Sequence, residues 1–300
     1  MNDFKRVNLN EYFVVSLWFG CNNNCVTCML SGIRNDLAPI GFEQFKKIVD
    51  DAKARGEFRN IILSGAEVTL LEDLDRYVSY VKDTGFFNRI QVQTNGRRLK
   101  NKEYLDHIVS LGVNEFFISI NGFENTHDCI SRSPGSYRDT MEGLHNLADY
   151  DVNVISNTVL SGMNFHEISR LIDFLVKRNI SEIHIWNYFP MEPFDSKNLI
   201  ISIPEFIKIL PGLSDTAEKS GKPLVLKGFP ECLQRDELPV YFDSDFPVTV
   251  LPEKFWEKFE KSGFGYCPHR EKCCSSTCWG ISKAYTEKYG DGRDILKPLE

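Results

Sequence analysis

Short runs of β-branched and aromatic residues alternate with helical patterns over the first two thirds of this chain. We expect strands near residues 13–19, 60–63, 89–93, 115–120, 153–160 and 182–188, and helices near 41–54, 71–84, 101–111, 137–150 and 164–178. This alternation predicts an α/β fold whose parallel strands are joined by helical crossovers. Six units are too few to close an eight-stranded barrel, and chemistry in such folds sits at the carboxyl ends of the strands.

Three cysteines follow directly after the first predicted strand, in the spacing Cys21-x3-Cys25-x2-Cys28. Thiolates are soft ligands that suit zinc or iron-sulfur clusters, and a loop at a strand end can bring three of them to one centre. A structural zinc ion takes four protein ligands, whereas three thiolates on a four-iron cluster leave one iron open for an exogenous ligand. Two other interpretations stay open at this point: three unrelated thiols, or part of a zinc site with a remote fourth ligand.

The composition indicates a folded protein of the cytoplasm. Hydrophobic residues make up 42% of the 300 positions, which is enough for a sizeable core. The sequence shows neither a secretory signal nor an apolar run of the ~20 residues that span a bilayer, so we expect no membrane partner. Nine cysteines in a reducing compartment are more often metal ligands than disulfides. The net charge of −7 argues against a nucleic-acid partner, and we interpret the basic residues 97–100 as solvated surface.

Polar motifs follow the second, third and fourth predicted strands. Residues 64–70 are Ser-Gly-Ala-Glu-Val-Thr-Leu, residues 93–96 are Gln-Thr-Asn-Gly, and residues 118–132 include Ser119 and Arg132. Taken alone, the first two are a strand-to-helix turn with an acidic residue in the next helical turn, and an Asn-Gly turn. Their shared position at strand ends places all three motifs on the same side of the sheet as the cysteines.

Together with the cysteine spacing, these motifs resemble the radical S-adenosylmethionine (SAM) superfamily, in which a CxxxCxxC loop on an open, partial (β/α)6 barrel holds a 4Fe-4S cluster. Residues 64–70 resemble its GGEPTL element, residues 93–96 its TNG turn, and residues 118–132 its S-x-D-G-x4-H-D-x3-R stretch. The sequence departs from these patterns at Ala66, Val68 and Asn121, which replace glycine, proline and aspartate. The resemblance implies that the cluster is held by Cys21, Cys25 and Cys28, and that SAM is bound by Ser64, Gly65, Ala66, Glu67, Asn95, Ser119, Arg132 and Asn157.

A second group of cysteines lies in the last third of the chain. It comprises Cys232, Cys267, Cys273, Cys274 and Cys278. These residues supply enough ligands for a second metal centre, either an iron-sulfur cluster or a structural zinc site. The arrangement resembles the Twitch-type extension of radical SAM enzymes, half of a SPASM domain, which implies one auxiliary 4Fe-4S cluster. Either Cys273 or Cys274 would be its fourth ligand, because adjacent residues are awkwardly placed to bind one cluster together.

A proline-bearing linker near residues 189–195 precedes the second group of cysteines. We therefore expect a radical SAM partial barrel over residues 1–198 and a Twitch-like domain over residues 199–300. Two further side chains are candidates for catalysis: Asn187 in the sixth predicted strand, and Cys129, which has no assigned partner. We expect His127 and Asp128 to organise the loop around them.

The resemblance implies an oxidoreductase-type radical enzyme. A reduced cluster would cleave SAM to methionine and a 5′-deoxyadenosyl radical, which takes a hydrogen atom from the substrate. A reductant such as flavodoxin or ferredoxin would supply the electron. We expect a peptide that is oxidised or crosslinked, as in RiPP maturation; the alternative is a dehydrogenase or epimerase of a small natural product such as an amino-sugar. A different class, a non-catalytic iron-sulfur or zinc binding module, is also considered.

Overall fold

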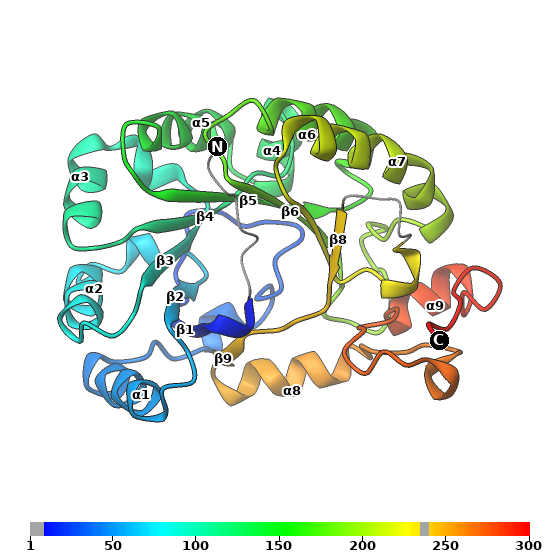
Figure 1. The fold of residues 1–300 in the computed structure, drawn as a ribbon, viewed down its shortest axis with the longest axis horizontal. Coiled ribbons are helices and arrows are strands. Elements are labelled where there is room, and N and C mark those ends of the chain that lie inside the picture. Colours follow the sequence, from blue (N-terminus) through cyan, green and yellow to red (C-terminus); the bar gives the residue numbers. More distant parts are fainter. Residues whose placement is uncertain (1–8, 235–239) are drawn as a thin grey trace.

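A single parallel sheet organises the protein (Figure 1). The computed structural model describes residues 9–234 and 240–300. Within these residues the sheet has nine strands in the order β8-β7-β6-β5-β4-β3-β2-β1-β9. Their bounds are β1 (Tyr12–Trp18), β2 (Asn60–Gly65), β3 (Arg89–Thr94), β4 (Glu115–Ser119), β5 (Asn153–Leu160), β6 (Glu182–Asn187), β7 (Leu224–Lys227), β8 (Val240–Asp243) and β9 (Val248–Val250).

Helices join the strands and surround the sheet (Figure 1). Those that precede β7 are α1 (Phe42–Arg55), α2 (Leu74–Asp83), α3 (Lys102–Ser110), α4 (Glu124–Ser131), α5 (Ser136–Leu147), α6 (Ile168–Leu175) and α7 (Ile203–Ser220). After β9 the chain forms α8 (Glu253–Lys261) and α9 (Lys283–Tyr289). Local signals set several helix ends: Ser202 caps the start of α7 by accepting from the Glu205 N–H, and left-handed Gly221 ends it.

The two faces of the sheet differ in polarity, because alternate residues of a strand point to opposite sides. Phe13, Val15 and Leu17 of β1 pack with the helices in the main core. On the inner face, the Glu115 carboxylate accepts hydrogen bonds from Tyr12 Oη at 2.7 Å, Gln91 Nε2 at 2.7 Å and Asn153 Nδ2 at 2.6 Å. This buried polar network fills the barrel near the amino ends of its strands. The remaining interior, at the carboxyl ends, is available for a site.

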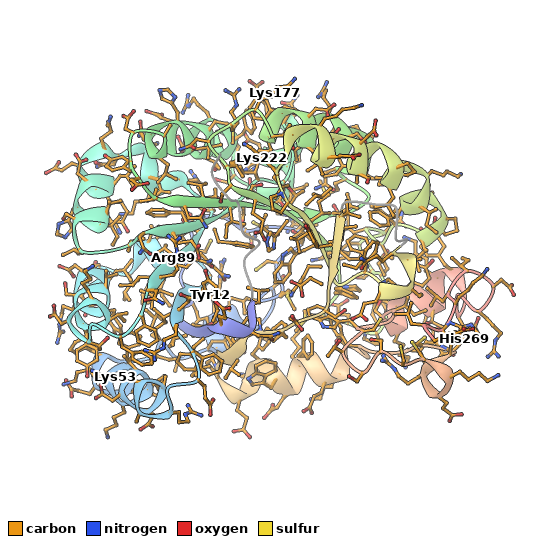
Figure 2. All side chains as sticks on the ribbon, in the orientation of Figure 1. Tyr12, Lys53, Arg89, Lys177, Lys222 and His269 are labelled. Carbon is orange, nitrogen blue, oxygen red and sulfur yellow. The ribbon has the colours of Figure 1, made fainter. Side chains whose placement is uncertain are left out.

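Figure 2 shows the same contrast across the whole molecule. Tyr12 lies inside the barrel and is 3% exposed, whereas the Lys53 and Lys177 side chains project from the outer helical layer into solvent. The ring of helices thus separates a polar barrel interior from solvent.

The expected α/β class with a parallel sheet is confirmed, and each of the six predicted strands is present. The sheet has more strands than predicted, because β7 and β8 follow β6 at one edge and β9 pairs with β1 at the other. Residue 198, the predicted domain boundary, falls between β6 and α7; a division into two domains there stays a prediction. None of the helices in the described ranges has the length and apolar character needed to cross a membrane.

Candidate active site

A cavity of about 260 Å³ lies at the carboxyl ends of β2 to β6. Its wall combines the cysteine loop, defined as residues 21–29, with side chains from these strand ends. The three predicted cluster ligands, Cys21, Cys25 and Cys28, all line it. Five residues predicted to bind SAM line it as well: Gly65, Ala66, Asn95, Ser119 and Asn157. Parallel strands that end together therefore bring motifs distant in sequence into one site.

Burial makes two thiols of the cysteine loop, those of Cys21 and Cys25, harder to ionise. Burial raises the pKa of Cys25 to about 12, and the nearby Cys28 and Cys21 thiols add to this effect. Burial also raises the pKa of Cys21. Such thiols become thiolates when a metal binds them, because the cation stabilises the negative charge. The donor set therefore fits an iron-sulfur cluster, in which each iron takes one thiolate.

Within residues 9–234 and 240–300, no group of three or more His, Cys, Asp or Glu side chains is placed to hold a metal ion. Zinc ligands must all lie about 2.0–2.3 Å from one point, whereas the cysteines of a four-iron cluster bind separate iron atoms.

Hydrogen bonds from two separate parts of the chain hold the cysteine loop in place. The backbone N–H groups of Asn24 and Val26 donate to the carbonyls of Ser131 and Ile130, at 2.9 and 2.8 Å. Lys197, from the linker after β6, donates through Nζ to the Val26 carbonyl at 2.6 Å. These contacts tie the loop to the end of α4 and to the start of the last third of the chain.

His127 and Asp128 organise this region, as predicted, but they do so from α4, because the stretch expected to be a loop is partly helical. His127 Nδ1 accepts from the Asn121 N–H at 3.2 Å. Burial lowers the pKa of His127 to about 4, which keeps the ring neutral and able to accept. The Asp128 carboxylate accepts from the N–H groups of Gly135 and Tyr137, at 2.5 and 2.8 Å, and so shapes the turn into α5.

Arg97 is the main residue of the site that the sequence interpretation missed. We interpreted residues 97–100 as solvated surface, yet the Arg97 side chain is only 16% exposed. Its Nη1 donates to the Asn22 carbonyl and to Asn23 Oδ1, both at 2.8 Å, and its Nη2 pairs with Asp139 at 3.2 Å. Its position directly after the Asn95-Gly96 turn was the available signal, because a side chain there begins at the same strand end as the cavity.

Glu67 is buried beneath the cavity and does not line it. Its carboxylate accepts from Thr69 Oγ1 at 2.6 Å, Thr94 Oγ1 at 2.7 Å and the Asn95 N–H at 2.7 Å. Burial raises the pKa of Glu67, although these hydrogen bonds oppose the rise. The residue therefore joins the end of β2 to the end of β3; the direct SAM contact predicted for it stays a prediction.

The turn after β2 requires glycine at position 65. Gly65 has φ of 145°, and a Cβ there would lie 2.0 Å from the Trp18 carbonyl oxygen. The same carbonyl accepts from the Ala66 N–H at 2.8 Å. Ser64, another predicted SAM ligand, donates to Gln93 Oε1 at 2.7 Å and is not among the cavity residues. Gly65 thus lets β2 approach the end of β1, which brings residue 66 to the cavity wall.

Two buried polar atoms in the cavity wall lack protein partners among the described residues. They are the acceptor Asn157 Oδ1 and the donor Trp186 Nε1. Buried polar groups are normally paired, so an unpaired donor and acceptor on one cavity indicate a polar ligand. SAM, with its ribose hydroxyls, adenine, amino group and carboxylate, supplies both kinds of partner. Neither Trp186 nor the neighbouring Phe117 was predicted as a site residue.

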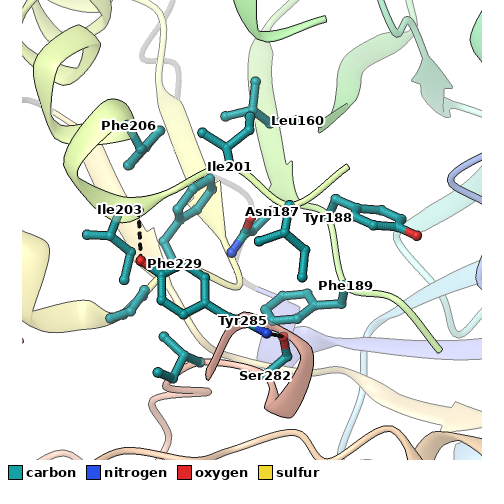
Figure 3. Close-up of a pocket in the computed structure, with 13 residues that line it drawn as sticks. Leu160, Asn187, Tyr188, Phe189, Ile201, Ile203, Phe206, Phe229, Ser282 and Tyr285 are labelled. Atoms are coloured by element: carbon teal, nitrogen blue, oxygen red, sulfur yellow. Dashed lines mark hydrogen bonds between the residues drawn. The ribbon is translucent and has the colours of Figure 1, made fainter. Parts of the chain in front are cut away.

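Three predicted residues lie away from this cavity. Arg132 is exposed and ends α4 in the left-handed conformation, with φ of 50°. Cys129 is exposed on α4. Asn187 lines a separate, small cavity of about 20 Å³, shown in Figure 3, and donates through Nδ2 to the Gly228 carbonyl at 3.2 Å. The roles assigned to these residues stay predictions.

The cavity in Figure 3 lies where the barrel meets the last part of the chain. Tyr285 of α9 closes one side, where its hydroxyl accepts from the Ile203 N–H at 3.0 Å. The Tyr285 N–H donates in turn to Ser282 Oγ at 3.1 Å. Most of the remaining wall is apolar. The Tyr285 hydroxyl contact holds α9 against the start of α7, whereas the Ser282 contact caps α9 itself.

The cysteines of the last third gather near η6 (Glu231–Leu233) and η7 (Arg270–Lys272). Burial raises the pKa of Cys232, and the nearby Cys278 and Cys267 thiols raise it further. The Leu299 N–H donates to Cys273 Sγ at 3.4 Å, whereas exposed Cys274 donates through its thiol to the Glu300 carbonyl at 3.4 Å. Only Cys273 of this pair therefore has the N–H contact that a thiolate favours.

Comparison with known proteins supports the resemblance to the radical SAM superfamily. The model of the radical SAM superfamily matches residues 15–175, which is more than half of the chain. A chain with a parallel α/β barrel, a three-cysteine loop at the strand ends and this match belongs to the radical SAM superfamily. Members of this superfamily are enzymes that use a 4Fe-4S cluster and SAM.

Among curated relatives, 7,8-dihydro-6-hydroxymethylpterin dimethyltransferase of Methanocaldococcus jannaschii is 25% identical over 244 residues, which cover 78% of this chain and 45% of the relative. The sporulation killing factor maturation protein SkfB of Bacillus subtilis is 26% identical over 172 residues, covering 55% and 40%. The chain spans about half the length of the curated relatives it matches. A structure of Streptococcus suis SuiB bound to the precursor peptide SuiA shares the fold, with a TM-score of 0.60, 13% identity and coverage of 96% of this chain and 56% of that one.

Proposed function

We propose that this protein is a radical SAM enzyme of the SPASM/Twitch type that oxidises or crosslinks a peptide. The make-up of the cavity wall carries the SAM chemistry, because it combines the thiols of Cys21, Cys25 and Cys28 with the unpaired polar atoms of Asn157 and Trp186. The similarity to SkfB, a maturation protein by name, supports a peptide as the substrate.

Different residues of the chain would bind the cluster and SAM. Cys21, Cys25 and Cys28 hold the cluster, while Asn157 and Trp186 offer their unpaired polar atoms to SAM. When bound, the reduced cluster supplies the electron that cleaves SAM and so produces a radical able to take a hydrogen atom from the substrate. The surrounding protein orients the two ligands and keeps water from the reacting carbon.

The thiols of the last third would hold one auxiliary 4Fe-4S cluster. We assign Cys232, Cys267, Cys273 and Cys278 as its ligands, because three share one electrostatic environment and Cys273 receives a backbone N–H. Removing a hydrogen atom from the substrate leaves a carbon radical, and a net oxidation requires that a further electron and a proton leave it. The auxiliary cluster would accept that electron.

An apolar pocket adjoins this second group of thiols. Cys278 lines it together with Phe246, Trp256, Phe259, Phe264 and Trp279, and its volume is about 300 Å³. An apolar side chain of a peptide would bury its surface there at a gain of roughly 25 cal/mol per Å². The pocket would therefore help to bring a peptide close to the auxiliary cluster.

A dehydrogenase or epimerase acting on a small molecule is the second candidate. One relative, whose match covers 78% of this chain, is by its name a pterin dimethyltransferase, and a pterin is a small molecule. Addition of candidate substrates to the reconstituted enzyme separates the two. A peptide that loses a pair of hydrogen atoms by mass spectrometry would support the first candidate; turnover of a sugar or pterin instead would replace it by the second.

The test of the radical SAM assignment is anaerobic reconstitution with iron and sulfide, followed by iron analysis and detection of SAM products after dithionite reduction. We expect about eight irons per chain, four per cluster, and 5′-deoxyadenosine. Full iron without any SAM product would indicate a non-catalytic binding module instead. A 3-amino-3-carboxypropyl fragment would mean that a different carbon-sulfur bond of SAM breaks.

A further inference from the structure

Within the part of the chain that the structure describes, Arg34 is the one Arg, Lys, Asp or Glu residue that lines the active-site cavity. It lies in the short turn η2 (Arg34–Asp36), and its side chain is half-buried. Arg34 and Cys28 also line an outer cleft of about 280 Å³ next to the cavity. His127, another basic residue of the cavity wall, is neutral because burial lowers its pKa to about 4. Arg34 therefore supplies the positive charge of this wall.

The Arg34 guanidinium is held against the middle of the cysteine loop. Its Nη1 donates to the Asn23 carbonyl at 3.0 Å, and the Asn23 N–H donates to Cys21 Sγ at 3.3 Å. The Arg34 N–H donates to the Leu30 carbonyl at 2.9 Å, which fixes the turn that carries the side chain. Asn23 thus connects the guanidinium to the first of the three predicted cluster ligands.

The charge of Arg34 is not neutralised by a carboxylate. Among the residues of known placement, no Asp or Glu forms an ion pair with it, and Asp36 of the same turn pairs with Lys254 at 2.9 Å instead. Arg97 differs in both respects, because it pairs with Asp139 at 3.2 Å and is not among the cavity residues. The two arginines contact the same stretch of the loop, but Arg34 alone brings an unpaired charge to the cavity.

This charge acts on the thiols of the cysteine loop. Burial raises the pKa of Cys21 and of Cys25, and the Arg34 charge opposes the rise at both. Glu67 acts on Cys21 in the other direction, but burial raises the pKa of Glu67 itself and so favours its neutral form. A charge in a partly buried site is screened less than one on the surface. Arg34 therefore favours negative charge at the position that the three thiols surround.

We propose that Arg34 raises the reduction potential of the cluster held by Cys21, Cys25 and Cys28, because its charge stabilises the more negative, reduced form. The inference rests on the proposed function, since it concerns the cluster that cleaves SAM. One electron leaves a one-electron reductant, which is oxidised, and enters the cluster, which is reduced; no proton moves and no bond changes. Net charge close to a cluster is one of the factors that set its potential.

The test is a redox titration of the reconstituted protein without SAM, followed by electron paramagnetic resonance. Arg34→Gln removes the charge, and the matched control Arg34→Lys keeps it while losing the planar guanidinium. The signal that is absent from Cys25→Ala belongs to this cluster, and the remaining signal serves as an internal reference. Iron analysis checks that each variant is loaded. Arg34→Met, with another neutral side chain, takes the place of Arg34→Gln if that variant does not take up iron.

At the wild-type midpoint potential, we expect the ratio of reduced to oxidised cluster to be about tenfold lower in Arg34→Gln than in the wild type. A tenfold change in this ratio is about 59 mV for a one-electron couple. Arg34→Lys should stay within about threefold of the wild type, and the reference signal should not shift in either variant.

An unchanged ratio in the neutral variant, or an equal fall in Arg34→Lys, would overturn the inference. An unchanged ratio together with a raised Kd for SAM, measured by isothermal titration calorimetry, would also overturn it and would make Arg34 a SAM ligand instead. Wild-type protein that assembles no reducible four-iron cluster would reject the proposed function itself. The two failures are therefore distinguishable.

Discussion

The two groups of cysteines are held in different ways. The cysteine loop of the barrel is anchored by side chains from separate elements, including Arg97 and Lys197, and by the backbone at the end of α4. The thiols of the last third are contacted, within the described residues, mainly by backbone N–H groups such as those of Glu231 and Leu299. Side chains also fasten the second group, because Ser275 Oγ donates to the Glu231 carboxylate at 2.6 Å and Arg270 Nη2 donates to the Cys278 carbonyl at 2.9 Å. The two groups thus differ in where their anchors come from: the first draws on strand ends and the linker after β6, the second on residues close to its own cysteines.

Loss of a barrel cysteine should have the largest effect. In Cys25→Ala we expect no 5′-deoxyadenosine and about four fewer irons per chain, because the SAM cluster loses one of its three ligands. The iron of the last third should remain, since its thiols are independent of the cysteine loop. Iron analysis and liquid chromatography of SAM products measure both. Retained SAM cleavage would contradict the assignment of this loop.

The adjacent pair in the last third gives a matched comparison. Cys273→Ala should remove about four irons and leave the radical SAM cluster in place, because we assign Cys273 as a ligand. Cys274→Ala should keep wild-type iron, since its thiol points to the Glu300 carbonyl. Iron counts and the electron paramagnetic resonance of the reduced proteins decide between them. The opposite pattern would exchange the two assignments.

Arg97 tests whether the anchoring of the cysteine loop matters for the cluster. Arg97→Lys keeps the positive charge beside Asp139 but cannot make all of the contacts to Asn22 and Asn23. Residues that orient metal ligands typically change affinity or activity by about 10–100-fold, and we expect a loss in that range. The readouts are SAM cleavage and the rate of iron loss to a chelator. Lys100 also pairs with Asp139, so Lys100→Arg serves as the matched control. Its SAM cleavage and its rate of iron loss should stay close to those of the wild type.

The smallest effect concerns acid stability of the barrel. Burial lowers the pKa of His127 to about 4 in the folded state, against about 6.5 when unfolded. As pH falls from 7 to 5, the unfolded chain binds a proton that the folded chain does not. His127 should therefore cost about 2 kcal/mol of unfolding free energy over that interval. Urea unfolding of metal-free protein at the two pH values measures the loss.

His127→Gln should reduce this pH dependence, because glutamine does not titrate and can still accept from the Asn121 N–H. His145→Gln, on the exposed side of α5, is the control and should behave as the wild type. An equal pH dependence in wild type and His127→Gln would show that this histidine is not held neutral.

Much of the fold could be predicted because its signals are local. The alternation of apolar runs and helical patterns placed β1 to β6 correctly, and the cysteine spacing follows directly after β1. The three later strands were missed because β7, β8 and β9 are only four, four and three residues long. Such short segments carry little periodicity of their own, and pairing with neighbouring strands forms them.

The site was predicted unevenly for a related reason. Asn95, Ser119 and Asn157 were found because they stand at strand ends, where side chains meet a common cavity. Arg97 was missed because the sequence of a basic run does not tell whether its side chains are solvated at the surface or buried in contacts with other residues, as Arg97 is. Glu67 was predicted to bind SAM, which stays a prediction, and its burial under the cavity could not be read from the turn that contains it.

The sequence by itself determined the α/β class, the three-cysteine loop after β1 and the second set of thiols, since each depends on residues near one another in the chain. Only the tertiary structure decided that Arg97 and Lys197 hold the cysteine loop, that Cys273 and Cys274 differ in surroundings, and that Cys28 borders two cavities. These features join segments distant in sequence, and their contacts exist only after the strands pair and the helices pack.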